Sequence, residues 1–94
     1  MSTVEWDDSK DDENVRKHNI PLRFAELIFQ GPFVEEEDTR RDYGETRFKA
    51  VGPIVDFNNR IFVAIYTWRG VDRRIISLRR ANDREIRKYQ ANVA

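Results

Sequence analysis

The chain has 94 residues, of which 36% are charged and 12% aromatic, and it contains no cysteine. This length fits a single domain over residues 1–94, and the missing cysteine excludes a disulfide framework and a thiolate metal site. No apolar run approaches the roughly 20 residues that span a bilayer, and the acidic N-terminus lacks the pattern of a signal peptide. We therefore expect a cytoplasmic protein with no membrane partner.

The formal net charge of zero conceals a strong asymmetry between the two halves. Residues 1–46 carry six Lys or Arg against thirteen Asp or Glu, a net charge of −7, whereas residues 47–94 carry eleven against four, a net charge of +7. Such asymmetry favours a nucleic acid or an acidic partner for the basic half. The acidic half can equally neutralise the basic half within the fold, and the sequence leaves both possibilities open.

Two helices are predicted near the N-terminus. Asp7 is a good N-cap for a helix that runs to about Lys17, and Asn19 can adopt the left-handed conformation that ends it. Residues 4–6 can add a short edge strand before this helix. Residues 21–29 form the second helix, since proline suits a first helical turn and apolar residues follow at three- and four-residue spacing.

Four strands and a closing helix follow. Residues 33–38 form an acidic strand, residues 45–51 alternate between apolar and polar positions, and residues 61–68 are apolar on both faces, which is typical of a central strand. A fourth strand begins at Arg73. The predicted fold is α+β, with two N-terminal helices, an antiparallel sheet of about four strands and a C-terminal helix.

The stretch 73–89 joins the last strand to the last helix and is dense in cations. Asn82 is the predicted N-cap, and Glu85 stands three positions on, where its carboxylate can bond back to the cap amide. Seven cations fall on this stretch, and only Asp83 and Glu85 oppose them; the seven are Arg73, Arg74, Arg79, Arg80, Arg84, Arg87 and Lys88. Cations at this density favour a polyanion or an acidic partner. The alternative is a solvated strand end and an ordinary amphipathic helix.

One face of the first predicted helix carries groups that can transfer protons or hold a phosphate. Lys10, Asn14, Lys17 and His18 share that face at helical spacing. His18 is the single histidine, and beside Lys17 it can act as a general acid or base. The alternative is a surface histidine at a helix end.

No metal site is expected from the acidic residues. Glu35–Asp38 are four consecutive carboxylates, but neighbours on a strand point to opposite faces, so we expect a solvated sheet edge. No glycine-rich phosphate loop, nucleophile elbow or zinc-ligand spacing is present. We therefore expect neither a metal nor a cofactor.

The basic half combines arginines on neighbouring strands with aromatic residues. The arginines are Arg47, Arg60, Arg69, Arg74 and Arg79, and the aromatic residues are Tyr66, Trp68 and Tyr89. Guanidinium groups bind phosphate bidentately and aromatic rings stack on bases, although Tyr66 and Trp68 can equally belong to the core. A base, an acid and cations suffice for metal-free RNA cleavage, in which the ribose 2′-OH attacks the neighbouring phosphate.

Several short motifs occur in a specific order along nearly the whole chain. They are Trp6-Asp7, Lys10, Asn14, Lys17-His18, Gly44-Glu45-Thr46-Arg47, Val51-Gly52, Arg60, Tyr66-Thr67-Trp68-Arg69-Gly70, Arg74-Ile75-Ile76-Ser77-Leu78-Arg79, Ala81, Arg84-Glu85 and Tyr89. Through them the chain resembles the BrnT family of bacterial toxins, whose fold is similar to RelE. The chain departs from the family pattern at four positions, which are Asn19, Pro21, Trp68 and Leu78.

The resemblance implies a ribonuclease toxin of a type II toxin–antitoxin pair, which blocks translation and growth by cutting RNA. Its implied partner is a BrnA-like antitoxin with a ribbon-helix-helix DNA-binding part, through which alone the toxin reaches operator DNA. The implied catalytic set is Lys17, His18, Arg47, Arg69, Arg74, Arg79 and Tyr89, with His18 or Tyr89 for proton transfer and the arginines for phosphate. The expected RNA-binding residues are Lys10, Arg60, Arg80 and Arg84. The alternative is a non-catalytic binding module, a degenerate toxin that acts as a co-repressor with its antitoxin.

Overall fold

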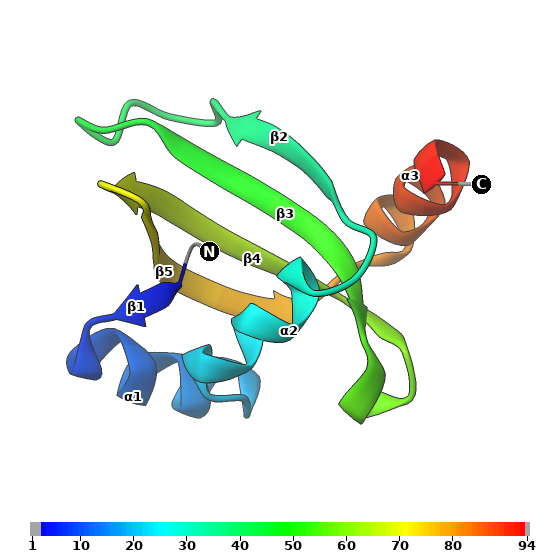
Figure 1. The fold of residues 1–94 in the computed structure, drawn as a ribbon, viewed down its shortest axis with the longest axis horizontal. Coiled ribbons are helices and arrows are strands. Elements are labelled where there is room, and N and C mark those ends of the chain that lie inside the picture. Colours follow the sequence, from blue (N-terminus) through cyan, green and yellow to red (C-terminus); the bar gives the residue numbers. More distant parts are fainter. Residues whose placement is uncertain (1–2, 94) are drawn as a thin grey trace.

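The computed structural model describes residues 3–93 and contains a five-stranded sheet in the order β1-β5-β4-β3-β2 (Figure 1). The strands are β1 (Val4–Trp6), β2 (Val34–Asp38), β3 (Arg47–Ile54), β4 (Arg60–Arg69) and β5 (Asp72–Arg80). The helices are α1 (Asp8–His18), α2 (Glu26–Phe29) and α3 (Asp83–Val93), with 3-10 turns η1 (Leu22–Ala25) and η2 (Val55–Phe57). No helix within residues 3–93 is long and apolar enough to cross a membrane.

The predicted order of two helices before four antiparallel strands is wrong. β1 comes first and pairs in parallel with β5, from Val4 beside Arg73 to Trp6 beside Ile75, so the sheet is mixed. The other three strand pairs are antiparallel. A three-residue strand shows too few alternations for its partner or direction to be read from periodicity. The short edge strand expected at residues 4–6 is confirmed.

The segment η1–α2 covers one face of the sheet, which we call the helix-covered face. The predicted second helix is instead a 3-10 turn followed by a single α-helical turn. Its inward side chains Leu22, Ala25 and Ile28 are fully buried, and they belong to one core cluster with Tyr66 and Leu78 of the sheet. Burying a side chain such as Leu or Ile contributes about 1.5–3 kcal/mol. This segment therefore anchors the N-terminal third of the chain to the sheet.

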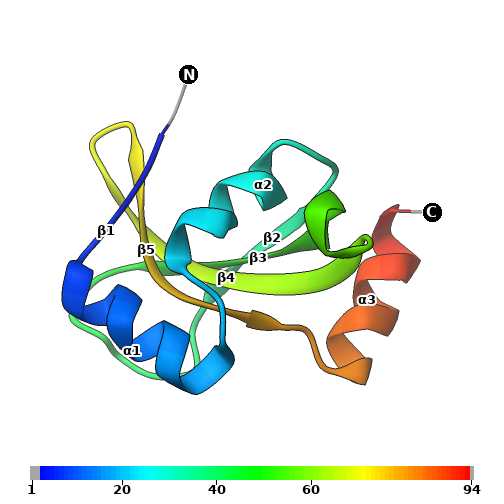
Figure 2. The same ribbon diagram turned by 90° about the horizontal axis from the view of Figure 1, so that it is seen from below.

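The opposite face of the sheet packs against α3, and we call it the α3 face. Val51, Val63 and Ile65 form a second cluster there with Tyr89 of the helix. Because β4 is buried on both sides over most of its length, the expectation of a central strand at residues 61–68 is confirmed. Figure 2 shows α2 on one side of the sheet and α1 and α3 at opposite ends of the molecule. Among residues 3–93, no helix covers the stretch of the α3 face between α1 and α3 (Figure 2).

Helix α1 begins and ends as the sequence predicts. The Asp7 carboxylate accepts a hydrogen bond from the backbone N–H of Ser9 at 2.8 Å, and Asn19 ends the helix with φ 58°. Asn14 attaches α1 to the edge of β5 beyond the end of β1. Its amide nitrogen donates to the carbonyl oxygens of Ile20 and Leu78, both at 2.8 Å, and its amide oxygen accepts from the N–H of Leu78 at 3.0 Å. The exposed face of α1 is thereby fixed beside β5.

The predicted start of α3 is confirmed. The N–H of Glu85 donates to the Asn82 side chain at 2.8 Å, and the N–H of Asn82 donates to the Glu85 carboxylate at 2.9 Å. Helix α3 extends to Val93. The sequence also predicts frayed ends at residues 1–3 and 92–94, of which residues 1, 2 and 94 lie outside the described part of the chain.

Candidate functional site

A cavity of about 170 Å³ lies between α1 and β5. It is lined by Lys10, Glu13, Asn14, Lys17 and His18 of the helix and by Ile76 and Ser77 of the strand. Three of the predicted site residues, Lys10, Lys17 and His18, therefore do meet at one place. All three are exposed, so a substrate can reach them.

Glu13 adds a carboxylate to this group of cations. Lys17 Nζ donates to Glu13 Oε1 at 2.6 Å. This hydrogen bond holds the pKa of Glu13 below its usual value, so the carboxylate is ionised at neutral pH. The sequence analysis missed Glu13, although its spacing of three from Lys10 and four from Lys17 places it on the same helix face. It also did not name Ser77 as a site residue, although Ser77 belongs to one of the motifs above, because its place beside α1 depends on how Asn14 docks the helix.

Two of the predicted arginines flank the α3 face close to this cavity. Arg74 of β5 is the cross-strand partner of Thr67 in β4. On the other side of β4, Phe48 of β3 pairs with Tyr66, so the preceding residue Arg47 lies beside Thr67. Arg47 and Arg74 are therefore two strands apart, about 10 Å between backbones, with Thr67 between them. Ser77 is the partner of Ile65, two residues before Thr67 and about 7 Å along the strand. The β5 wall of the α1 cavity, at Ser77, and the two arginines thus lie on one face of the sheet.

The ion pairs of these arginines are weak enough to exchange for a phosphate. Arg74 lies 3.5 Å from Glu5 and 3.7 Å from Asp7, and Arg47 lies 3.1 Å from Glu45 with its guanidinium 4.0 Å from the Tyr43 ring centroid. Such partly exposed pairs contribute about 1 kcal/mol or less. They leave both guanidinium groups available to a substrate.

Arg69 extends the same row of cations at the end of β4. It stands two residues beyond Thr67, which places it on the same face. Its side chain is exposed and has no ion-pair partner within residues 3–93. Arg47, Arg69 and Arg74 therefore gather at one end of the α3 face.

Arg79 and Tyr89 are held by structural contacts between α3 and the sheet. Arg79 binds the Glu85 carboxylate with two bonds of 2.8 and 2.9 Å, and Lys49 binds the same carboxylate at 2.8 Å. The hydrogen bonds from Arg79 hold the pKa of Glu85 well below its usual range. Tyr89 is buried, its hydroxyl donates to the carbonyl of Pro32 at 2.8 Å, and burial raises its pKa. Both residues fasten α3 to the sheet.

The remaining cations of the stretch 73–89 do not converge. Arg73 lies on the helix-covered face among aromatic rings, 3.9 Å from the Phe29 centroid and 4.6 Å from that of Trp68. Lys88 pairs with Glu36 at 2.8 Å, and Arg84 is exposed in the first turn of α3. The cations of this stretch are therefore distributed over both faces of the sheet and do not form one basic cluster.

Of the two aromatic residues whose role was left open, Tyr66 belongs to the core. It is fully buried, its hydroxyl donates to the Glu35 carboxylate, and burial raises its pKa. Trp68 is 39% exposed and packs edge-on against Tyr66, with ring centroids 5.8 Å apart. Of these two residues, Trp68 is therefore the one that presents an aromatic surface to solvent.

The acidic strand β2 is mostly, but not entirely, the solvated edge that was expected. Glu35, Glu36 and Glu37 are exposed, but Asp38 is buried and accepts two bonds from Arg40 at 2.8 and 2.9 Å. These bonds lower the pKa of Asp38 to about 2. Within residues 3–93 no three His, Cys, Asp or Glu side chains are grouped so that they could hold a metal ion.

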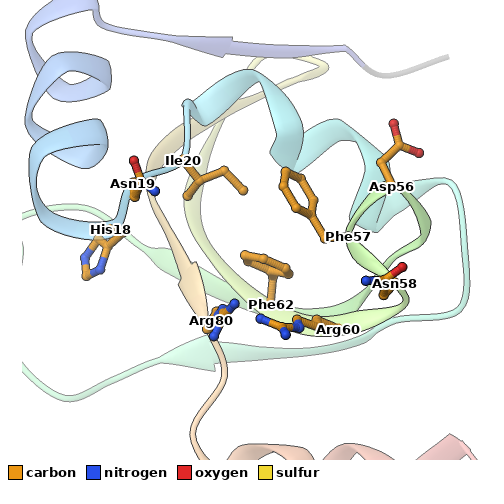
Figure 3. Close-up of a pocket in the computed structure, with 9 residues that line it drawn as sticks. All are labelled: His18, Asn19, Ile20, Asp56, Phe57, Asn58, Arg60, Phe62 and Arg80. Carbon is orange, nitrogen blue, oxygen red and sulfur yellow. The ribbon is translucent and has the colours of Figure 1, made fainter.

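Arg60 and Arg80 line a second and larger cavity, of about 450 Å³, on the other side of His18 (Figure 3). The cavity lies on the helix-covered face, because Arg80 is the cross-strand partner of the core residue Phe62. These two predicted RNA-binding residues therefore share His18 with the α1 cavity but occupy a separate site.

Comparison with known proteins places the chain in a family. The family model described as "Ribonuclease toxin, BrnT, of type II toxin-antitoxin system" matches residues 6–85. The crystal structure of the Brucella abortus ribonuclease toxin BrnT has the same fold, with a TM-score of 0.64 and 22% identity over 88% of this chain and 100% of that one. No curated protein matches the chain in sequence. The chain belongs to the BrnT family of ribonuclease toxins of type II toxin–antitoxin systems.

Proposed function

We propose that the protein is a metal-independent endoribonuclease whose active centre is the α1 cavity together with the adjoining arginines of the α3 face. The observation that supports this most is that Lys10, Lys17 and His18 of α1 line one cavity with Ser77 of β5, the strand that also carries Arg74. Groups able to transfer protons and groups able to bind phosphate thus share one open surface.

The reaction needs only parts that this surface supplies. The ribose 2′-oxygen attacks the adjacent phosphorus, the bond from phosphorus to the 5′-oxygen breaks, and a 2′,3′-cyclic phosphate and a 5′-hydroxyl remain. One group accepts the 2′-OH proton and another donates a proton to the departing 5′-oxygen. Cations stabilise the negative charge that builds up on the phosphoryl oxygens.

We assign roles to the residues from their positions. Glu13 accepts the proton of the 2′-OH, and His18 in the same cavity donates a proton to the departing 5′-oxygen. Lys17 and Arg74 bind the phosphate being cleaved. Arg47 and Arg69 hold the neighbouring backbone on the same face. Tyr89 and Arg79 have no part in this scheme, since their polar groups are engaged in docking α3.

The family supports the cellular role. Cleavage of RNA by the toxin would inhibit translation and growth in the cytoplasm, and a cognate antitoxin would neutralise it. We propose a BrnA-like antitoxin with a ribbon-helix-helix part, through which the complex reaches operator DNA. Co-expression with the neighbouring reading frame should restore the growth that the toxin alone arrests.

The decisive experiment incubates the purified protein with end-labelled RNA in the presence of a chelator. We expect internal cuts whose upstream fragments end in a 2′,3′-cyclic phosphate. Full-length RNA after prolonged incubation, with salt-sensitive binding retained, would instead identify a non-catalytic module that acts as a co-repressor. Cleavage that stops when chelator is added would contradict metal independence.

A further inference from the structure

The larger cavity beside His18 has the size and shape of a ligand site. Its volume of about 450 Å³ falls within the range of about 300–1,000 Å³ that is typical of small-molecule pockets. Its walls come from the end of α1, the turn η2 and the facing ends of β4 and β5 (Figure 3). His18 lines this cavity as well as the α1 cavity. A chain that occupies the proposed active centre can therefore continue into it.

Resting on the proposed function, we propose that this cavity binds the RNA nucleotide next to the link being cut. The cavity thus holds the nucleotide that neighbours the cleaved link. It thereby raises the affinity of the protein for RNA longer than two nucleotides.

Two uncompensated arginines make the cavity suitable for a phosphate. Arg80 is the cross-strand partner of Phe62, and Arg60 precedes Phe62 by two residues on the same face. Both arginines are exposed, and neither has an ion-pair partner within residues 3–93. Asp56 is the one carboxylate among the residues that line the cavity. Guanidinium forks without a protein partner are well suited to a phosphodiester.

Aromatic and amide groups in the same cavity are suited to a base. The rings of Phe57 and Phe62 lie 5.5 Å apart, and Phe57 is only partly buried, so it can present an edge or a face to a ligand. Single-stranded RNA is commonly held by stacking of its bases on aromatic side chains. Asn58 and Asp56 at the rim add a donor and acceptors for a base edge. Phosphate-binding and base-binding groups therefore occur together at nucleotide scale.

The test compares two RNA substrates that contain the same cleavable link, a dinucleotide and an octanucleotide. We measure the ratio of kcat/KM for the octanucleotide to kcat/KM for the dinucleotide. In the double variant Arg60→Ala/Arg80→Ala this ratio should fall about tenfold, as expected when charge-assisted bonds are lost. Phe57→Ala should lower it in the same direction. Arg87→Ala, which removes an exposed cation from α3, serves as the matched control and should leave the ratio unchanged.

A binding measurement separates this proposal from the proposed function. Adenosine 5′-monophosphate should shift the backbone amide resonances of Asn58 and Phe62 in the wild-type protein and not in the double variant. If the wild-type protein cuts no RNA but these shifts appear, the nuclease proposal fails and the nucleotide site stands. The nucleotide-site proposal is overturned if the double variant keeps the wild-type Tm and its ratio of kcat/KM for the octanucleotide to that for the dinucleotide is unchanged. Weaker antitoxin binding with an unchanged ratio overturns it as well and assigns the cavity to the protein partner.

Discussion

The side-chain amide of Asn14 makes two hydrogen bonds to the backbone of Leu78, accepting from its N–H at 3.0 Å and donating to its carbonyl at 2.8 Å. These are the bonds that a further residue of an edge strand would make. Asn14 is itself 97% buried, so both backbone groups are satisfied away from water. The proposed active centre depends on this contact, because it sets the distance between α1 and Ser77.

Asn14→Ala should therefore lower stability and loosen the site together. The variant loses three hydrogen bonds and leaves the Leu78 groups unpaired, so we expect a loss of about 2–4 kcal/mol in the free energy of unfolding. Urea unfolding measures it. Val15→Ala changes the adjacent, 40%-exposed residue and is the control, with an expected loss below about 1 kcal/mol. Equal effects of the two substitutions would show that Asn14 does not fasten the helix.

At Gly52, β3 packs closely against the end of α2 and the residues that follow it. A Cβ at Gly52 would stand 3.0 Å from Phe33 Cβ and 3.2 Å from both Ile28 Cγ2 and the Pro32 carbonyl oxygen. Gly52→Ala should therefore destabilise the protein by about 1–3 kcal/mol. Gly31→Ala is the matched control, because nothing lies within 4 Å of its Cβ position, and it should change stability by less than about 1 kcal/mol in either direction. The reverse order of the two variants in thermal or urea unfolding would refute this packing.

The carboxylate of Glu85 predicts a pH-dependent attachment of α3. Hydrogen bonds from Arg79, and then from Lys49, lower its folded-state pKa far below the usual 4.5. A lowered folded-state pKa contributes stability that is complete above the unfolded value and is lost as the pH falls towards the folded value. Glu85→Gln should therefore cost roughly 2 kcal/mol at pH 7. This difference should shrink steadily below pH 4.5.

Urea unfolding of both proteins between pH 7 and pH 2 measures this difference. Glu26→Gln is the control, because Glu26 is exposed on the surface of α2, and its effect should be small at every pH. A difference between wild type and Glu85→Gln that stays constant down to pH 2 would rule out the proposed role of the charge.

Substitution of Arg74 should reduce RNA cleavage, whereas substitution of Arg79 should reduce stability. Arg74→Ala removes only long, partly exposed ion pairs, so it should leave Tm nearly unchanged and reduce RNA cleavage about 10- to 100-fold through lost phosphate stabilisation. Arg79→Ala leaves the largely buried Glu85 with Lys49 as its remaining cation, so it should cost roughly 2 kcal/mol of stability. Parallel melting curves and cleavage rates measure both effects. An Arg79→Ala protein that keeps its Tm and loses cleavage would move Arg79 into the active centre.

The features that the sequence predicted correctly are those that depend on neighbouring residues. The cap at Asp7, the left-handed Asn19, the reciprocal bonds of Asn82 and Glu85 and the central strand at 61–68 all follow from local pattern. The parallel pairing of β1 with β5 joins residues about 70 positions apart, and no local pattern encodes it.

A β-bulge divides the cations of β5 between the two faces of the sheet. Tyr66 pairs with Ile75 but Ile65 pairs with Ser77, so Ile76 is an extra residue in the strand. Strict alternation would put Arg74 and Arg79 on opposite faces, whereas the bulge puts both on the α3 face and turns Arg73 and Arg80 to the helix-covered face. Periodicity alone cannot locate an inserted residue, and the sequence therefore gave no means of dividing these arginines between the two sites.

The central claim is that Lys17 and His18 act on RNA at the surface they share with Ser77. The most direct test is the single-turnover cleavage rate of Lys17→Ala and His18→Ala with chelator present, each compared with Arg16→Ala, which removes an exposed cation from α1 outside the cavity. We predict that both site variants cut labelled RNA at least about 100-fold more slowly than Arg16→Ala, with all three Tm values close to wild type. Cleavage by Lys17→Ala and His18→Ala at the rate of Arg16→Ala would contradict the account.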